Sequence, residues 1–317
     1  MKTRRFILAA LVALTTISVS AQQVTTLYFL ENAPMRHTIN PAFQPVSKGY
    51  INFTPLGWMS LGIGNNSLTM QDVIFVDPTT GQTITILHPN AMEKRSKLLD
   101  KMHSMLYING DINLGLLNMG FRVKDNGFLT IGINERIEVG ETTPKSMFNF
   151  LLGGGMTDLT GGINTLSLSG LGIGAQAYTE ISGGYSHKIN EQWTVGGKLK
   201  VLLGTAYIGM NAKQANLYAN TEVWQIDGNM NLDIAGPINM EYLDPYINNK
   251  TGMDIYNSFT GEGGAPKIDF NQMIDLKNWK KLLVPSGYGA AIDLGFTWKP
   301  IENLQVSAAI KIGRAHV

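Results

Sequence analysis

LGIGAQAYTEISGGYSHK, residues 171–188, is the stretch of sequence that decides the fold. One set of alternate positions is mostly apolar and consists of Leu171, Ile173, Ala175, Ala177, Thr179, Ile181 and Tyr185. The other set is mostly small or polar and consists of Gly172, Gly174, Gln176, Tyr178, Glu180, Ser182, Ser186 and Lys188. Because successive side chains of a β-strand point to opposite faces, a period of two over about 18 residues predicts one long strand with two different faces.

The same alternation recurs in other parts of the chain. The paired stretches are 117–123 with 129–139, 171–188 with 193–207, and 288–298 with 304–310. Asp125-Asn126-Gly127 joins the first pair, and Asn-Gly is a strong hairpin signal. Residues 49–64 also alternate, whereas residues 211–269 show only weak alternation. The pattern predicts an all-β, antiparallel sheet of roughly seven to nine long strands.

Aromatic residues on the apolar face predict two girdles at the membrane interfaces, where Trp and Tyr gather. These residues are Tyr185, Trp193, Tyr207, Tyr288 and Trp298. The 14 residues from Trp193 to Tyr207 would span roughly 35 Å at a rise of ~3.3 Å and a tilt of ~40°. A soluble periplasmic sandwich would alternate as well, but such long strands exceed the globular mode of about five or six residues. The sequence therefore predicts a transmembrane β-barrel with short periplasmic turns.

Residues 1–21 have the organisation of a secretory signal peptide. Lys2, Arg4 and Arg5 precede a short apolar run, and Val19-Ser20-Ala21 offers a small-residue cleavage site. The apolar run is shorter than the roughly 20 residues of a membrane-spanning helix. The chain contains no Cys, which excludes a lipoprotein anchor, disulfides and thiolate metal sites. We expect export, cleavage of the leader, and a location in the cell outer membrane.

The rest of the chain divides into three parts. Residues 22–47 contain two prolines and are expected to form a plug-like or periplasmic lead-in. Residues 48–311 are expected to form the outer-membrane β-barrel. Residues 312–317, IGRAHV, match a translation of a common sequencing-adapter read, and we interpret them as an artefact that the gene does not encode. Because the chain stops inside a strand that has just begun, we expect a barrel that is truncated at its C-terminal side.

The long connections contain three helix-like stretches. Residues 90–106 open with a capping-box pattern, residues 143–152 begin with Thr-Pro, and residues 271–283 form the third stretch. On the extracellular side they would either line an entry for a hydrophobic ligand or pack on one another as a lid. The second interpretation is favoured.

Charged and amide side chains on the polar faces are the candidates for lining a lumen. They are Arg122, Asn134, Arg136, Gln176, Glu180, Lys198, Lys200 and Asp293. An unpaired buried charge costs several kcal/mol, so we expect pairing across strands, for instance between Glu180 and Lys198 or Lys200. Such a network would seal or filter a narrow channel.

Several function classes are disfavoured by the composition. A net charge of +1 is unlike the basic surface of a nucleic-acid-binding protein. The five histidines show no metal-ligand spacing, and no phosphate-binding loop or Ser-His-acid set is evident. We therefore expect no enzyme activity, no cofactor and no metal.

Three short motifs carry a resemblance to known proteins. They are Arg36-His37-Thr38-Ile39-Asn40-Pro41-Ala42-Phe43, Met119-Gly120-Phe121-Arg122-Val123 and Thr130-Ile131-Gly132-Ile133-Asn134-Glu135-Arg136. With these motifs, residues 25–311 resemble an uncharacterised family of Bacteroidota outer-membrane β-barrels. Asn40-Pro41-Ala42 is also similar to the hatch motif of long-chain fatty-acid transporters and of the related type IX secretion barrel. The Gly expected after that tripeptide is replaced by Phe43.

The resemblance implies a plug formed by residues 22–47 and a porin-like passage of small or hydrophobic solutes. Its implied partners are outer-membrane lipid, the barrel-assembly machinery and a hydrophobic or small polar solute, with no nucleic acid. A structural or secretion-associated barrel without transport activity is the alternative, and a lipid-acting enzyme is the third class. Deletion of residues 22–47 would separate the first two classes, and a serine-reactive probe would test the third.

Overall fold

The computed structural model of the chain describes most residues beyond the leader. The described residues are 25–54, 58–152, 164–219, 224–237, 239–251, 254, 257–258, 261–264, 266–273, 284–301 and 303–316. The predicted signal peptide lies outside them, as do residues 274–283 of the third predicted helix.

Strands make up most of the described structure. They are β1 Gly49–Phe53, β2 Met59–Asn65, β3 Ile74–Val76, β4 Thr83–Thr85, β5 Met105–Val123, β6 Gly127–Pro144, β7 Asn164–Ser167, β8 Gly172–Lys188, β9 Trp193–Ala219, β10 Trp224–Ala235, β11 Gly287–Ile301 and β12 Leu304–His316. The helices are short: α2 Thr25–Phe29, η1 Pro34–Thr38, α3 Met70–Val73, η2 Pro89–Ala91, α4 Met92–Lys101, α5 Lys145–Leu152, α6 Met240–Ile247, η3 Glu262–Gly264 and α8 Phe270–Met273. The chain is mostly β, and the predicted antiparallel sheet of long strands is confirmed.

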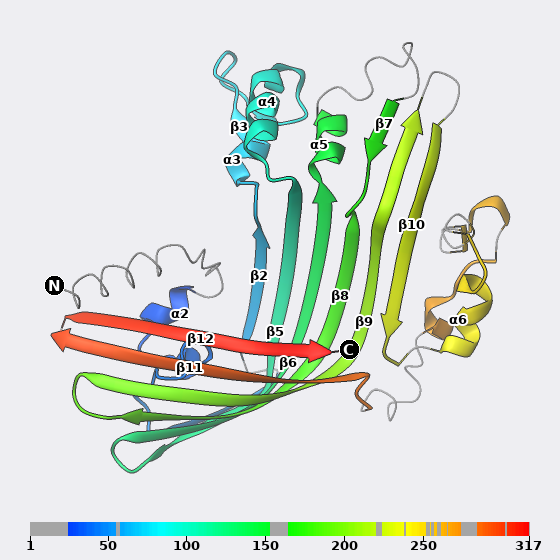
Figure 1. The fold of residues 1–317 in the computed structure, drawn as a ribbon. Coiled ribbons are helices and arrows are strands. Elements are labelled where there is room, and N and C mark those ends of the chain that lie inside the picture. The colour runs from blue at the N-terminus through cyan, green and yellow to red at the C-terminus, as the bar shows by residue number, and fades with distance from the viewer. Residues whose placement is uncertain are drawn as a thin grey trace, which may run out of the picture.

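Ten of the described strands form one antiparallel sheet. Its main order is β1-β5-β6-β8-β9-β11-β12, with β2 also paired to β5 and with β7 and β10 also paired to β9. This exceeds the predicted seven to nine strands, because residues 49–64 contribute two strands and β7 and β10 add two more. Figure 1 shows that the sheet is strongly curled, so that β11 and β12 cross the view while β9 and β10 rise away from them.

Strand β9 changes its neighbour halfway along its length. Residues 193–204 pair with β11, whereas residues 207–219 pair with β10. Along its other edge β9 pairs with β8 over most of the same length. Since one strand serves two partners in succession, the sheet divides beyond Gly204 into the two arms visible in Figure 1.

Single-residue bulges shift the faces of two long strands. Leu116 in β5 and Thr205 in β9 are each an extra residue with no partner in the neighbouring strand. A bulge inserts one residue into the alternation, so every later side chain moves to the other face. Tyr207 consequently pairs with Gln176 on the inner face of the sheet. The prediction that Tyr207 faces outward in an aromatic girdle is wrong for this reason.

The two faces of the sheet have opposite chemistry. We call the face that carries Glu180 the inner face and the opposite face the outer face. On β9, Leu199 is 66% exposed on the outer face, and the adjacent Lys200 is 9% exposed on the inner face. On β8, Ile181 and Glu180 show the same contrast. The predicted period of two is therefore confirmed for these strands, with apolar side chains outward and polar side chains buried.

The remaining aromatic candidates lie on the outer face. Trp193 and Trp298 pair directly across β9 and β11, with stacked rings whose centroids are 5.6 Å apart. Both residues border short turns, and Tyr185 lies near the same end of β8, whereas Tyr288 lies at the far end of β11. The outer face is not wholly apolar, because Thr179 donates a hydrogen bond of 2.7 Å to the Glu135 carboxylate there.

The helices of the first long connections, α4 and α5, pack on one another beside the start of β5 and the end of β6. A small apolar core joins α4, α5, the start of β5 and the segment after β4; its buried members are Ile86, Leu98, Met102, Leu106 and Leu152. The predicted packing of the first two helical stretches on one another is confirmed, because Leu98 of α4 and Leu152 of α5 belong to this core. Helix α4 ends at Lys101, and Pro144 belongs to β6, so both predicted helices are shorter than expected. Among the described residues, no helix has the length and hydropathy required to cross a bilayer.

Candidate functional site: the polar inner face and the segment packed on it

All eight predicted lining residues lie on the inner face of the sheet. Strand β5 contributes Arg122, β6 contributes Asn134 and Arg136, β8 contributes Gln176 and Glu180, β9 contributes Lys198 and Lys200, and β11 contributes Asp293. Antiparallel pairing aligns them, because residues opposite each other in a ladder share a face. The polar surface therefore extends across five neighbouring strands.

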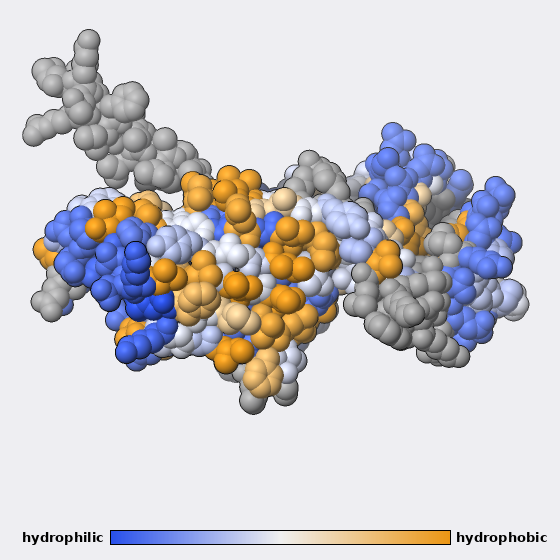
Figure 2. Space-filling model, turned by 90° about the horizontal axis from the view of Figure 1, so that it is seen from below, coloured by the Kyte–Doolittle hydropathy of each residue, from blue (hydrophilic) through white to orange (hydrophobic). Residues whose placement is uncertain are grey.

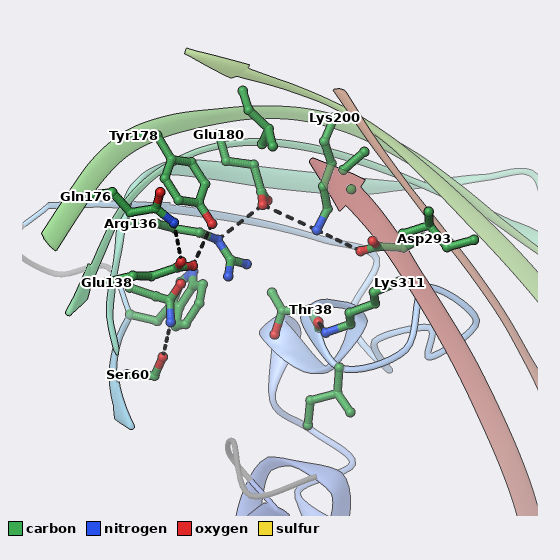
Figure 3. A pocket seen from close by; sticks show the side chains of 17 residues that line it. Thr38, Ser60, Arg136, Glu138, Gln176, Tyr178, Glu180, Lys200, Asp293 and Lys311 are labelled. Atoms are coloured by element: carbon green, nitrogen blue, oxygen red, sulfur yellow. Dashed lines mark hydrogen bonds and ion pairs between the residues drawn. The ribbon is translucent and has the colours of Figure 1, made fainter. Parts of the chain in front are cut away.

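A charge network occupies the centre of this surface. The Lys200 ammonium lies 2.8 Å from the Asp293 carboxylate and 3.3 Å from the Glu180 carboxylate. The Arg136 guanidinium lies 3.2 Å from the same Glu180 carboxylate. Figure 3 shows these side chains meeting from four strands. The predicted pairing of Glu180 with Lys200 is confirmed, and Glu180 holds two cations in place of one.

Further inner-face residues extend this network. Glu138 accepts hydrogen bonds from the Gln176 amide at 2.6 Å and from the Tyr178 hydroxyl at 2.7 Å. Asn118 donates to Asn134 at 2.8 Å. Sequence reasoning did not select Glu138, Tyr178 or Asn118 as candidates. The alternation did mark them, because each lies an even number of residues from a selected residue of the same strand: Glu138 from Arg136, Tyr178 from Gln176 and Asn118 from Arg122.

Lys198 contacts the N-terminal segment, which we define as residues 25–47. Its ammonium lies 2.9 Å from Nδ1 of His37, and His37 Nε2 contacts the Tyr50 hydroxyl of β1. A lysine ammonium has only donors, so Nδ1 accepts and the ring proton lies on Nε2. Burial lowers the pKa of His37 well below its ordinary value, and the Lys198 ammonium lowers it further. The imidazole is therefore neutral where it lies between the segment and the sheet.

Asn40 binds the segment to the last two strands. Its side-chain amide donates to the main-chain carbonyl oxygens of Phe296 in β11 and Ala308 in β12, each at 3.1 Å. Its own oxygen accepts from the main-chain nitrogen of Ala42 at 2.9 Å. The side chain thus uses both its donor and its acceptor, and it fixes Asn40-Pro41-Ala42 on the inner face.

Two glycines provide the space for this tripeptide. Gly196 of β9 and Gly295 of β11 lie opposite each other in the ladder. A Cβ added at Gly196 would lie 2.6 Å from the Ala42 nitrogen and nearer still to the Pro41 carbonyl. A Cβ added at Gly295 would collide with the Asn40 side chain. We call this pair the glycine seat, because the segment approaches the sheet where no side chains intervene.

Cationic side chains of the sheet hold the segment on either side of the glycine seat. Arg122 donates to the Pro45 carbonyl at 2.7 Å and to the Gln44 side chain at 3.2 Å. Lys311 of β12 donates to the Thr38 carbonyl at 2.6 Å. These contacts, together with Asn40 and His37, connect the segment to β1, β5, β9, β11 and β12. Residues far apart in sequence are thereby joined across the curl of the sheet.

A cavity of about 400 Å³ lies between the segment and the charge network. Thr38 borders it on the side of the segment, and Figure 3 shows Arg136 and Lys311 reaching into it from opposite sides. Its lining is polar and mixed in charge. Among the described residues, no group of three His, Asp or Glu side chains could hold a metal ion.

Comparison with known proteins gives one match. The profile of a family of unknown function (DUF5723) matches residues 41–311, which include the glycine seat and all eight lining residues. No curated protein and no solved structure matches the chain. Because the matched region covers most of the sequence, the chain belongs to the DUF5723 family.

Proposed function

We propose that this chain forms the wall of an outer-membrane β-barrel whose N-terminal segment closes a passage for small or hydrophobic solutes. The observation that carries the proposal is the reversed polarity of the sheet. Ile292 is 38% exposed on the outer face, whereas the adjacent Asp293 is only 2% exposed on the inner face. In water, exposing a Leu or Ile forgoes about 1.5–3 kcal/mol, and burying charges costs several kcal/mol unless they are paired. Lipid outside and a polar lumen inside would remove this conflict.

The distribution of residues along the outer face supports the same assignment. Figure 2 shows apolar side chains over the middle of the visible face and hydrophilic residues towards its ends. The stacked Trp193 and Trp298 lie beside the short turns, as interfacial aromatic residues do in outer-membrane barrels. Strand β8 has 17 residues, which is long enough to cross an apolar band about 25 Å tall at a tilt of ~40°.

The N-terminal segment supports the closing function. It lies on the inner face, and the side chains of Asn40, Arg122 and Lys311 connect it to the sheet. A barrel that conducts solute must move or bypass this segment. Similarity of Asn40-Pro41-Ala42 to a hatch motif is consistent with a segment that moves. The second candidate function, a structural or secretion-associated barrel, is favoured instead if this many contacts hold the segment permanently.

Deletion of residues 22–47 distinguishes the two functions. The chain with and without these residues is reconstituted into liposomes loaded with small polar dyes and with a hydrophobic fluorescent solute. We expect both proteins to float with the liposomes and the deletion variant to release solute faster. The Lys97→Met variant, changed on an exposed face of α4, is the control for handling and should behave as the unaltered chain.

Each alternative outcome has a defined meaning. Flotation without faster release would favour the structural barrel with a permanently fixed segment. Failure of the unaltered chain to float with liposomes would contradict the membrane assignment itself. Loss of assembly only in the deletion variant would assign the segment to partner binding or folding and would contradict gating.

A further inference from the structure

The contact between His37 and Lys198 has an unusual composition for a buried contact. Both side chains are basic, and both are nearly inaccessible, with 4% and 5% of their surface exposed. Among the described residues, no carboxylate lies within ion-pair distance of either one. The contact is favourable only while His37 is neutral, because a neutral Nδ1 accepts from the ammonium and a protonated ring cannot.

The surroundings of His37 offer no compensation for a second positive charge. From β9 it faces Lys198 and, at longer range, Lys200, and from β1 it faces the Tyr50 hydroxyl. Its own helix adds Arg36, and β12 contributes Lys311 at the neighbouring Thr38. The nearby carboxylates Glu180 and Asp293 are already paired with Lys200. Protonation in place would therefore put an imidazolium among cations.

We propose that His37 and Lys198 form a proton-sensitive latch that holds the N-terminal segment on the inner face and releases it as the pH falls. Lys198 is the fixed cation on the sheet, and His37 is the titrating group on the movable segment. Detachment from the sheet would return His37 to water and remove it from Lys198. The docking equilibrium rests on these contacts alone, whereas its consequence for solute passage rests on the proposed function.

The direction of the pH effect follows from the two states of His37. In the released segment His37 titrates near its ordinary pKa of about 6.5. In the docked segment burial and the Lys198 ammonium hold its pKa well below that value. The released state therefore binds more protons below pH ~6.5. Docking weakens by up to tenfold per pH unit from there down to the docked pKa.

Distance measurements between spin labels test the latch directly. The chain has no Cys, so Leu30→Cys in the segment and Glu191→Cys in the β8–β9 turn give a unique labelled pair, and both positions are exposed. The full chain is measured in detergent micelles and in liposomes between pH 8 and pH 5. The same pair is placed in the Asn40→Ala background, where weaker docking brings the released population into the measurable range.

We expect the long-distance population to rise as the pH falls below ~6.5, by up to tenfold per unit in the Asn40→Ala background. His37→Gln, which keeps an acceptor but cannot protonate, should abolish the pH dependence, and Lys198→Met should reduce its total extent. His187→Gln, on the outer face, is the matched control and should keep the full response.

Two results would overturn the latch: distances that do not change between pH 8 and pH 5 in the Asn40→Ala background, or a His37→Gln variant that keeps the full pH response. The membrane assignment is judged separately by flotation of the same labelled protein. A chain that floats without a pH response refutes only the latch, and a chain that responds in micelles but does not float refutes only the proposed function.

Discussion

Substitution of Gly196 by Ala is the smallest change that should dislodge the N-terminal segment. The new methyl group would lie 2.6 Å from the Ala42 nitrogen, against a normal contact distance of about 3.5–4.0 Å. The segment must therefore withdraw by about 1 Å. The hydrogen bonds from Asn40 to Phe296 and Ala308, each 3.1 Å long, would then be broken.

The size of the effect follows from these contacts. Overpacking typically costs about 1–3 kcal/mol, and two neutral hydrogen bonds contribute about 1 kcal/mol each. Because withdrawal relieves the overlap at the expense of the bonds, the two losses do not add. We estimate that Gly196→Ala weakens docking of the segment by about 2 kcal/mol, which corresponds to a released population about 30-fold larger.

Thiol labelling measures this population. Met35 is 5% exposed within the segment, so Met35→Cys in this cysteine-free chain supplies one protected thiol. We expect Gly196→Ala to raise its labelling rate about 30-fold at constant pH. Gly183→Ala is the matched control, because a methyl group there meets no atom within 4 Å. Equal rates in Gly196→Ala and Gly183→Ala proteins would refute the assignment of the glycine seat.

Three further predictions concern the charge network, the turn between β3 and β4 that contains Asp77, and the outer face. Lys200→Met leaves Glu180 and Asp293 without their shared cation, and it should lower the free energy of unfolding by about 3–5 kcal/mol in denaturant titrations. Lys97→Met, at an exposed pair, is the control and should lower it by less than about 1 kcal/mol. Equal effects of the two substitutions would contradict the network. Hydrogen bonds from the Asn90 side chain and the Thr79 main chain lower the pKa of Asp77 to about 2. The stability that these bonds give to the loop is therefore present above the ordinary carboxyl pKa and is lost as the pH falls through about 2. Asn90→Ala should raise that pKa in an NMR titration, and an unchanged value would exclude Asn90 as the cause. In a bilayer, Leu199→Arg should lower the free energy of unfolding by about 2–4 kcal/mol, whereas Leu87→Arg in a loop should change it little. Equal unfolding free energies of the two variants would argue against lipid at Leu199.

The alternating strands could be predicted from sequence because the pleat of a strand imposes its period directly on the residues. Ile181 and Glu180 occupy the predicted faces, and so do the eight polar lining residues. The pairing of Glu180 with Lys200 could be anticipated for the same reason. Both lie on polar faces of adjacent strands, and buried charges require partners.

The bulges were not predictable from the same pattern. Leu116 and Thr205 each follow a glycine, Gly115 and Gly204, but other glycines of these strands, such as Gly120 and Gly196, are paired without any shift of register. Alternation continues on both sides of an extra residue, so only the pairing with the neighbouring strand reveals the shift. This explains the error at Tyr207. It also explains why the change of partner along β9 was missed.

The β5–β6 turn was located correctly for a partly different reason. The connection comprises residues 124–126, and the positive φ belongs to Lys124 at 54°. Gly127 is already in β6, where a Cβ would collide with the Tyr185 side chain. A glycine at this position therefore avoids close contact with the Tyr185 side chain of β8 and with the Val123 main-chain oxygen of β5.

The contacts of the N-terminal segment depend on tertiary structure alone. His37 and Lys198 are 161 residues apart, and Asn40 is 256 residues from Phe296. No local pattern relates such positions. The Asn-Pro-Ala motif marked the segment for attention, but its seat became visible only when Gly196 and Gly295 were aligned by the sheet.

The most direct test of the membrane assignment is the environment of neighbouring side chains on β8 and β9. Spin labels are placed at Ile181, Ser182 and Leu199 of the chain reconstituted in a bilayer, with Glu93 in α4 as the aqueous reference. For each label, the collision rate with oxygen, which concentrates in lipid, is compared with the collision rate with a water-soluble nickel complex. A lipid-facing outer surface requires frequent oxygen collisions and rare nickel collisions at Ile181 and Leu199, with the opposite preference or protection from both at Ser182. Nickel collisions at Ile181 and Leu199 as frequent as at Glu93 would contradict it.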